Sequence, residues 1–136
     1  MLKHGQRHKQ MSVIYYYFYF FYKKIRKDDD PHMLTVMALS ASEAFVSAVT
    51  VEIFLAKNYC YLMDTWAMFS FIPIYLLLNY LFFIRGAKHL RIVQDEPKFF
   101  NSSKLSAFIT LLFFLFTDSF IFWGPFVIKN ILDDCK

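Results

Sequence analysis

Long apolar stretches separated by polar segments dominate the pattern of this chain. The last of them, Leu105–Ile128, holds 24 residues with one formal charge. As a helix it would be about 36 Å long, which exceeds the roughly 30 Å hydrocarbon thickness of a bilayer. A chain of 136 residues has no interior large enough to hide such a segment from water. The pattern therefore predicts a membrane-spanning helix at 105–128.

Two further stretches complete a predicted set of three spans. Trp66–Ile84 has 19 residues and no formal charge, with aromatic residues near both edges, as membrane interfaces favour. The stretch 33–56 is less apolar, because it carries Glu43 near its centre and Glu52 toward its end. Its small residues gather on one helical face, which would let a neighbouring helix approach closely. We therefore predict that 33–56 spans the membrane and faces the interior of the bundle, with Glu52 solvated near the membrane edge.

The aromatic run near the amino terminus predicts a different kind of helix. Residues 12–27 contain eight consecutive aromatics and end in a basic cluster, and the run is too short to span a bilayer. In a helical projection, one stripe is apolar and the opposite face holds polar-tipped tyrosines and cations. The apolar stripe consists of Ile14, Phe18, Phe21 and Ile25. This arrangement is typical of an amphipathic helix that lies in the headgroup plane with its apolar stripe in lipid.

Composition agrees with a membrane protein. The chain is 57% hydrophobic and contains 18 Phe and 9 Tyr but only 3 Gly, so it carries more ring surface than a small water-soluble core could bury. We therefore predict one all-α membrane domain over 1–136. It has three transmembrane helices, 33–56, 66–84 and 105–128, and an amino-terminal in-plane amphipathic helix, 12–27.

The basic residues fall unevenly on the two sides of the predicted membrane. Three spans place the amino terminus and the segment 85–104 on one side, which holds twelve of the 15 Lys and Arg residues. Cytoplasmic segments carry such an excess, so we expect the amino terminus in the cytoplasm and the carboxyl terminus outside. The segment 85–104 could also bind anionic lipid headgroups, although topology alone accounts for its charge. We expect no nucleic-acid partner.

Three polar residues mark the predicted midplane, one on each span: Glu43, Asn79 and Asp118. Intramembrane carboxylates often belong to proton or ion paths, which is the functional interpretation. The structural interpretation is a hydrogen-bonded cluster that holds the helices together. We favour adhesion, because relays usually need more sites or a water path than three spans provide.

No catalytic signature accompanies these residues. The sequence has no glycine-rich phosphate loop, no HExxH zinc motif and no GxSxG nucleophile motif. We therefore predict neither an enzyme nor a cofactor or metal site. His32 and His89 lie at predicted membrane edges, where we expect them to contact water or headgroups.

The two cysteines suggest a covalent link. Cys60 and Cys135 form no metal or redox motif, and three spans place both outside the cytoplasm. In a bacterium that side is oxidising, so a disulfide can form if the Cα atoms lie within about 7 Å. We favour the alternative, in which the two cysteines stay unpaired.

The sequence at the end of the second predicted span is similar to that of a known group of membrane proteins. Leu78-Asn79-Tyr80 runs into a basic stub that contains Phe82, Phe83, Arg85, Gly86 and Lys88. Together with the aromatic start and the Phe-rich last span, this segment resembles a family of short three-span bacterial inner-membrane proteins whose function is uncharacterised. The resemblance implies a bacterial inner membrane and supplies no catalytic residues.

Two classes of function fit these features. The first is a non-enzymatic accessory or interaction protein that binds another membrane protein or itself, and an immunity-type protein belongs to this class. The alternative is a small oligomeric pore, holin-like or ion- or proton-conducting, that uses Glu43 and Asp118. An enzyme that acts on lipid is a more distant third.

Overall fold

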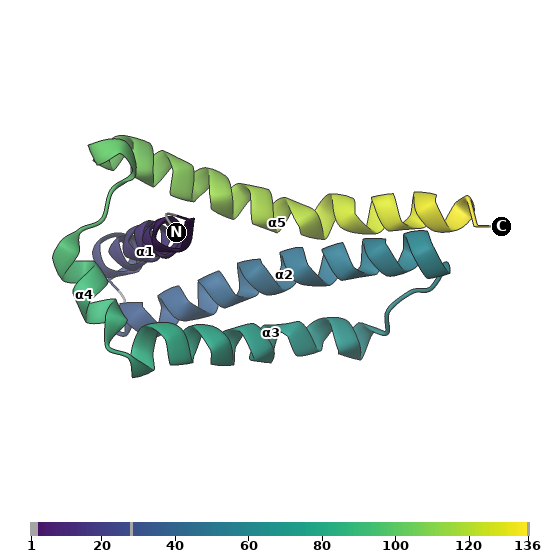
Figure 1. Ribbon diagram of the computed structural model, residues 1–136, viewed down its shortest axis with the longest axis horizontal. Helices are drawn as coiled ribbons and strands as arrows, with labels where there is room; N and C mark the ends of the chain where they lie inside the picture. Colours follow the sequence, from purple (N-terminus) through teal and green to yellow (C-terminus); the bar gives the residue numbers. More distant parts are fainter. Residues whose placement is uncertain (1–2, 28, 136) are drawn as a thin grey trace.

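The structure is a computed structural model that describes residues 3–27 and 29–135, and over those residues it contains helices and no strands. The α-helices are α1 (Lys3–Phe20), α2 (Pro31–Tyr59), α3 (Thr65–Asn79), α4 (Lys88–Asp95) and α5 (Ser103–Asp133). Two π-helical segments, η1 (Phe21–Arg26) and η2 (Tyr80–Arg85), extend α1 and α3, and a 3-10 turn, η3 (Phe99–Asn101), precedes α5. Figure 1 shows α2 in the middle of the bundle, with α3 on one side and α5 on the other.

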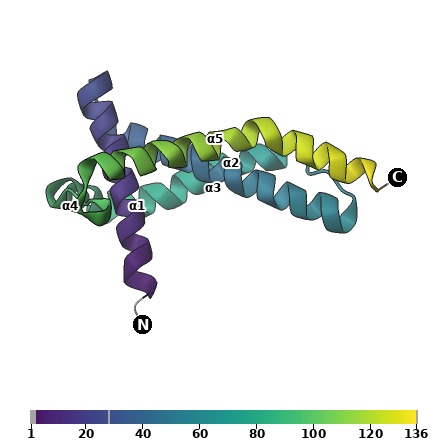
Figure 2. The ribbon, with the colours of Figure 1, turned by 90° about the horizontal axis from the view of Figure 1, so that it is seen from above.

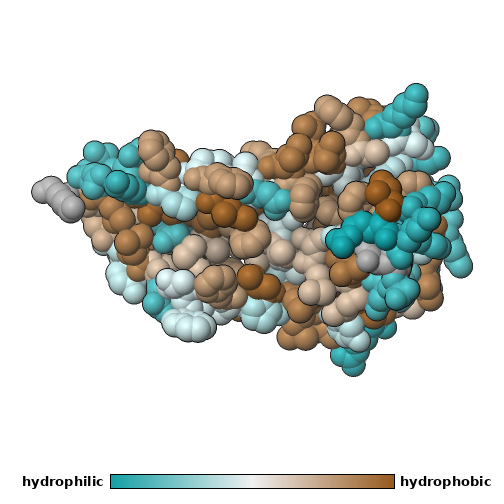
Figure 3. Space-filling view, turned by 180° about the vertical axis from the view of Figure 1, so that it is seen from behind, coloured by the Kyte–Doolittle hydropathy of each residue, from teal (hydrophilic) through white to brown (hydrophobic). Residues whose placement is uncertain are grey.

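Three helices are long and apolar enough to cross a membrane: α2, the continuous helix Thr65–Arg85, and α5. Each predicted span lies inside one of these helices, which extend it at both ends. Figure 3 shows hydrophobic residues over the middle of the molecule and hydrophilic residues gathered at the end that holds α1 and α4. The chain is therefore an all-α protein with three candidate membrane spans.

Side-chain caps determine where the three long helices begin. The Asp30 carboxylate accepts a hydrogen bond from the Met33 N–H at 3.1 Å, and Pro31 occupies the first turn of α2. Asp64 and Ser102 cap α3 and α5 in the same manner. Each cap supplies an acceptor to N–H groups that have no partner within the helix. These caps place the starts of the spans close to the polar residues that separate the apolar stretches.

The small-residue face of α2 is used inside the molecule. The most apolar 18 residues of each candidate span are buried to different extents. In α2, 44% of these residues are buried inside the protein, whereas the share is 11% in Thr65–Arg85 and 22% in α5. Ser40, Ala44 and Ala48 are all buried. On the α5 side, a Cβ added to Gly124 would lie 2.8 Å from a methyl carbon of Val49, so this glycine lets the two helices touch. The interior position predicted for 33–56 agrees with this packing.

Helix α1 crosses the bundle instead of running along it, as Figures 1 and 2 show together. It reaches the end of the bundle where α2 begins. The predicted apolar stripe is divided there: Ile14 and Phe18 are buried against the protein, whereas Phe21 and Ile25 are exposed. The expectation that the whole stripe faces lipid is thus wrong for its first half. The reason is that Ile14 and Phe18 pack into a core with residues of α2, η2 and α4 at this end.

A hydrophobic core lies at this crossing. It joins residues of α1, α2, η2 and α4: Ile14, Tyr15, Phe18, Tyr19, Val36, Leu39, Phe83 and Ile92. Helix α4 reaches the core because the chain turns back after η2 through Ala87, whose left-handed φ of 51° breaks the helix. The four elements thus share one core at the same end of the bundle.

Candidate functional site

Two of the three predicted midplane residues are joined by a hydrogen bond. The Asn79 side chain donates from Nδ2 to Glu43 Oε2 at 2.7 Å and to Ser40 Oγ at 3.2 Å. Asn79 is the last residue of α3, and Ser40 and Glu43 lie one turn apart on α2, so all three side chains meet at one level. The Ser40 hydroxyl in turn donates to the Val36 carbonyl oxygen at 2.6 Å. The cluster therefore joins two spans.

The same seam between α2 and α3 carries further polar contacts. Ser47 Oγ and the Tyr75 hydroxyl lie 2.6 Å apart, and Ser40 Oγ lies 3.3 Å from the Tyr75 carbonyl oxygen. Interhelical hydrogen bonds of this kind contribute on the order of 0.6–2 kcal/mol each in membranes. The contacts join α3 to α2 in a defined register. Adhesion as the role of Glu43 and Asn79 stays a prediction.

Asp118 stands apart from this cluster. It is the middle residue of α5 and is only partly buried. The residues one turn before and after it, Leu115 and Phe122, are 56% and 82% exposed. Because residues three and four positions apart share a helix face, Asp118 lies on the outward face of α5. Among the described residues it makes no hydrogen bond or ion pair. Of the three residues predicted to form one cluster, Glu43 and Asn79 contact each other and Asp118 does not join them.

Sequence reasoning missed a cluster of tyrosine and histidine side chains at the crossing. The Tyr15 hydroxyl lies 2.9 Å from His32 Nδ1, and the Tyr19 ring stacks on the His32 ring at 4.3 Å between centroids. His89 contacts His32 edge-on at 4.7 Å and donates from Nδ1 to the Phe83 carbonyl oxygen at 3.0 Å. Burial raises the pKa of the Tyr15 hydroxyl, and the neighbouring Tyr19 adds to the rise.

Both histidines are half-buried and pack against other rings of the protein. The expectation that they also contact water or headgroups stays a prediction. The signal in the sequence was the spacing of Tyr15 and Tyr19, four residues apart, which places two polar-tipped rings on one helix face. Tyrosine is buried readily where its hydroxyl finds a partner. His32 supplies that partner, but only after α1 crosses α2.

The opposite end of the bundle holds a disulfide. Cys60 and Cys135 are bonded, with Cα atoms 6.1 Å apart and 75 positions between them in the sequence. Cys60 follows the last residue of α2, and Cys135 follows the end of α5. The bond therefore ties the ends of these two helices together, and it lies at the far end of the spans from α1 (Figure 1).

Beside the disulfide, α2, α3 and α5 border a mainly apolar cavity of about 700 Å³ that is open to the outside. Glu52 lines it and is 7% exposed, and its carboxyl oxygens stay accessible to solvent within the cavity. The solvated position expected for this residue therefore stays a prediction. Lys129 lines the same cavity. In the part of the chain that the structure describes, Glu52 makes no hydrogen bond or ion pair. The cavity lies beside the disulfide, at the end of the bundle away from α1 (Figure 1).

Searches of family models, of curated proteins and of solved structures found no match to this chain. The resemblance to three-span bacterial inner-membrane proteins therefore stays a prediction. Within the described residues, 3–27 and 29–135, there is no group of three or more His, Cys, Asp or Glu side chains that could hold a metal ion. The site that the geometry singles out is thus a set of polar groups on membrane helices, in which Glu43 is paired and Asp118 is open.

Proposed function

We propose that this chain is a non-enzymatic interaction protein of the membrane, which binds a spanning helix of another membrane protein through the outward face of α5. The observation that carries the proposal is Asp118, a carboxyl group at the middle of a 31-residue span with exposed apolar residues on either side. A free Asp at the centre of a spanning helix costs about 2.5–3.5 kcal/mol on insertion scales. A donor on a neighbouring helix removes much of that cost.

The contrast with Glu43 indicates what the partner should offer. Within the chain, the Asn79 amide donates a hydrogen bond of 2.7 Å to the Glu43 carboxyl group. Asp118 needs an equivalent donor from outside: an amide, a hydroxyl or a basic side chain at the membrane midplane. In a symmetric dimer across this face, two Asp118 carboxyl groups would confront each other, and like charges that close cannot both ionise. A different chain that carries a donor is therefore the better fit.

We further propose that the molecule lies in a bacterial inner membrane with the end that holds α1 and α4 in the cytoplasm. The unequal distribution of Lys and Arg supports this orientation. In it, α1 lies near the headgroups with Phe21 and Ile25 toward lipid, and the disulfide lies on the oxidising side. Reporter fusions test the orientation: a fusion at Asp95 should read as cytoplasmic, and fusions at Cys60 or after Lys136 as external.

Site-specific photo-crosslinking in intact cells tests the partner. A photoreactive residue in place of Leu115, one turn from Asp118, should give an adduct of defined mass, and one in place of Phe69 on α3 should not. Asp118→Asn, which still forms hydrogen bonds, should retain the Leu115 adduct. Asp118→Leu should lose it while leaving the fold intact, because the carboxyl group has no partner among the described residues.

Two outcomes would contradict the proposal. One is an adduct whose yield is the same with Asp118→Leu as with Asp118, since the carboxyl group would then play no part in binding. The other is ion or proton conductance by the purified protein in liposomes that disappears with Asp118→Asn, which would establish the pore-forming alternative.

A further inference from the structure

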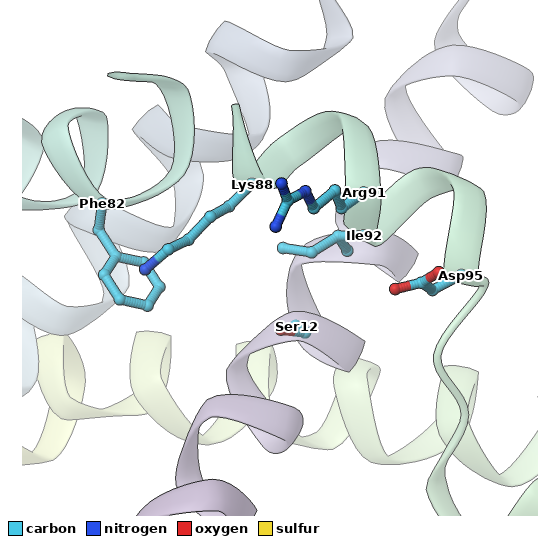
Figure 4. A pocket seen from close by; sticks show the side chains of 6 residues that line it. All are labelled: Ser12, Phe82, Lys88, Arg91, Ile92 and Asp95. Carbon is cyan, nitrogen blue, oxygen red and sulfur yellow. The ribbon is translucent and has the colours of Figure 1, made fainter. Parts of the chain in front are cut away.

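A basic pocket lies at the crossing end, separate from Asp118 and from the cavity beside the disulfide. It has a volume of about 270 Å³ and is lined by Ser12 of α1, Phe82 of η2 and four residues of α4: Lys88, Arg91, Ile92 and Asp95 (Figure 4). The pocket forms because α4 folds back over α1 after the end of the second span. Its lining combines two apolar side chains with three charged ones and the Ser12 hydroxyl.

The two cations are the chemical core of this pocket. The Lys88 ammonium lies 3.7 Å from the centre of the Phe82 ring, a cation–π contact that holds it over the end of the span. Figure 4 shows the Arg91 guanidinium turned away from Asp95 and toward the backbone end of Lys88, whose ammonium extends to the Phe82 ring. Among the described residues, Arg91 makes no hydrogen bond or ion pair. An unpaired guanidinium and an oriented ammonium thus line the same pocket, and together they suit an oxyanion that lies between them.

The charge of the lining and its position select the anion. Lys88, Arg91 and Asp95 together leave one net positive charge, which matches the single negative charge of a phosphodiester. A guanidinium binds phosphate oxygens through two parallel hydrogen bonds, and the Ser12 hydroxyl adds a neutral polar group on the opposite wall. Helix α4 begins three residues after the end of η2, so the pocket lies where the second span leaves the membrane.

We propose that this pocket binds a phosphate ester, supplied by the headgroup of an anionic phospholipid. Phe82 and Ile92 then border the glycerol and the first acyl carbons, while Arg91 and Lys88 hold the phosphate. Bound lipid would fasten α4 to α1 and so stabilise the crossing. A zwitterionic choline lipid fits less well, because its quaternary ammonium would face the same two cations.

Thermal unfolding of the purified full-length chain in an uncharged detergent tests the site. Phosphatidylglycerol should raise the unfolding temperature more than phosphatidylcholine, and native mass spectrometry should show one retained phosphatidylglycerol. The double variant Lys88→Gln/Arg91→Gln should bind it roughly 30-fold more weakly. Lys57→Gln/Lys129→Gln, which removes the same charge from the opposite end, should bind like the parent chain.

The same unfolding measurement with free glycerol 3-phosphate distinguishes a lipid headgroup from a soluble phosphate ester as the ligand. If the soluble ester raises the unfolding temperature as much as the lipid does, and the Lys88/Arg91 variant abolishes the effect, the pocket binds phosphate but the lipid assignment is overturned. If the two double variants respond equally to phosphatidylglycerol, the pocket itself is excluded as a binding site.

Discussion

At the end where α1 crosses, the spans are held by buried side chains, whereas at the opposite end they are held by one covalent bond. The crossing packs rings and aliphatic residues from four elements, with Tyr15 and Phe83 almost fully buried and stacked at 4.6 Å. The far end has the bond between Cys60 and Cys135 and a cavity of about 700 Å³ beside it.

The comparison shows two ways to stabilise a small membrane bundle. Spanning helices gain little from hydrophobic burial against each other in lipid, so they need close packing, hydrogen bonds or covalent links. At the crossing, a fourth and a fifth helix provide packing and paired polar rings. At the far end only the three spans are present, and the disulfide takes the place of that packing. The two ends should therefore respond to different perturbations.

The largest effect is expected from removing a ring at the crossing. Phe83→Ala deletes a side chain that is 1% exposed and should lower the free energy of unfolding by about 3–5 kcal/mol. Unfolding in mixed micelles, followed by circular dichroism, measures the change. Phe116→Ala on α5, where the ring is 61% exposed, is the control and should have little effect. Equal losses in the two variants would mean that the crossing core is not a distinct source of stability.

Removing the disulfide should weaken the opposite end. For a separation of 75 residues, the double variant Cys60→Ser/Cys135→Ser should lose about 2–4 kcal/mol. The loss should be local, because the crossing does not depend on the bond. Hydrogen exchange should accelerate in the last turns of α2 and α5 and remain slow around Leu39. Acceleration at Leu39 as large as that at the helix ends would show that the two ends are not independent.

A smaller effect is expected between the two ends, where α2 and α5 touch. In Gly124→Ala the added Cβ would meet a Val49 methyl carbon at 2.8 Å, so we expect a loss of about 1–3 kcal/mol. Adding Val49→Ala makes room, and the double variant should recover part of the loss. A double-mutant cycle measures this coupling. Additive single effects would mean that the helices are not in close contact at this point.

The smallest effect concerns the pH dependence of the crossing. Because burial raises the pKa of Tyr15, the folded state holds its proton more tightly than the unfolded state does. Its contribution is fully present below the unfolded tyrosine pKa of about 10 and is lost as the pH rises above that value. Tyr15→Phe should cost about 1 kcal/mol at neutral pH.

Unfolding measured from pH 7 to 11 in both chains tests this expectation. The difference in stability between the parent chain and Tyr15→Phe should shrink above pH 10, and Tyr17→Phe serves as the control. A constant difference across the range would show that Tyr15 is not buried in its neutral form.

The hydrogen bond between Glu43 and Asn79 shows which contacts a residue pattern can predict and which it cannot. Glu43 and Asn79 were expected at one depth, and depth follows from counting residues along two helices. Whether Asp118 joins them depends instead on the rotation of α5 about its axis. Gly124 of α5 faces Val49 of α2, and with that face turned inward Asp118 lies on the outward side. The crossing was harder still to foresee, because the aromatic run of 12–27 is equally suited to lipid and to protein.

The sequence by itself determined the three spans, the caps that begin them and the unequal distribution of basic residues. Each of these features depends on residues that are close together in the sequence. The free energy of moving a segment from water into lipid and the presence of a capping side chain are both local properties. The tertiary structure alone decided that Tyr15 meets His32, that Asp118 remains open and that Arg91 faces a pocket. These outcomes depend on how helices distant in the sequence rotate and cross, and apolar periodicity does not specify the crossing of one helix over another.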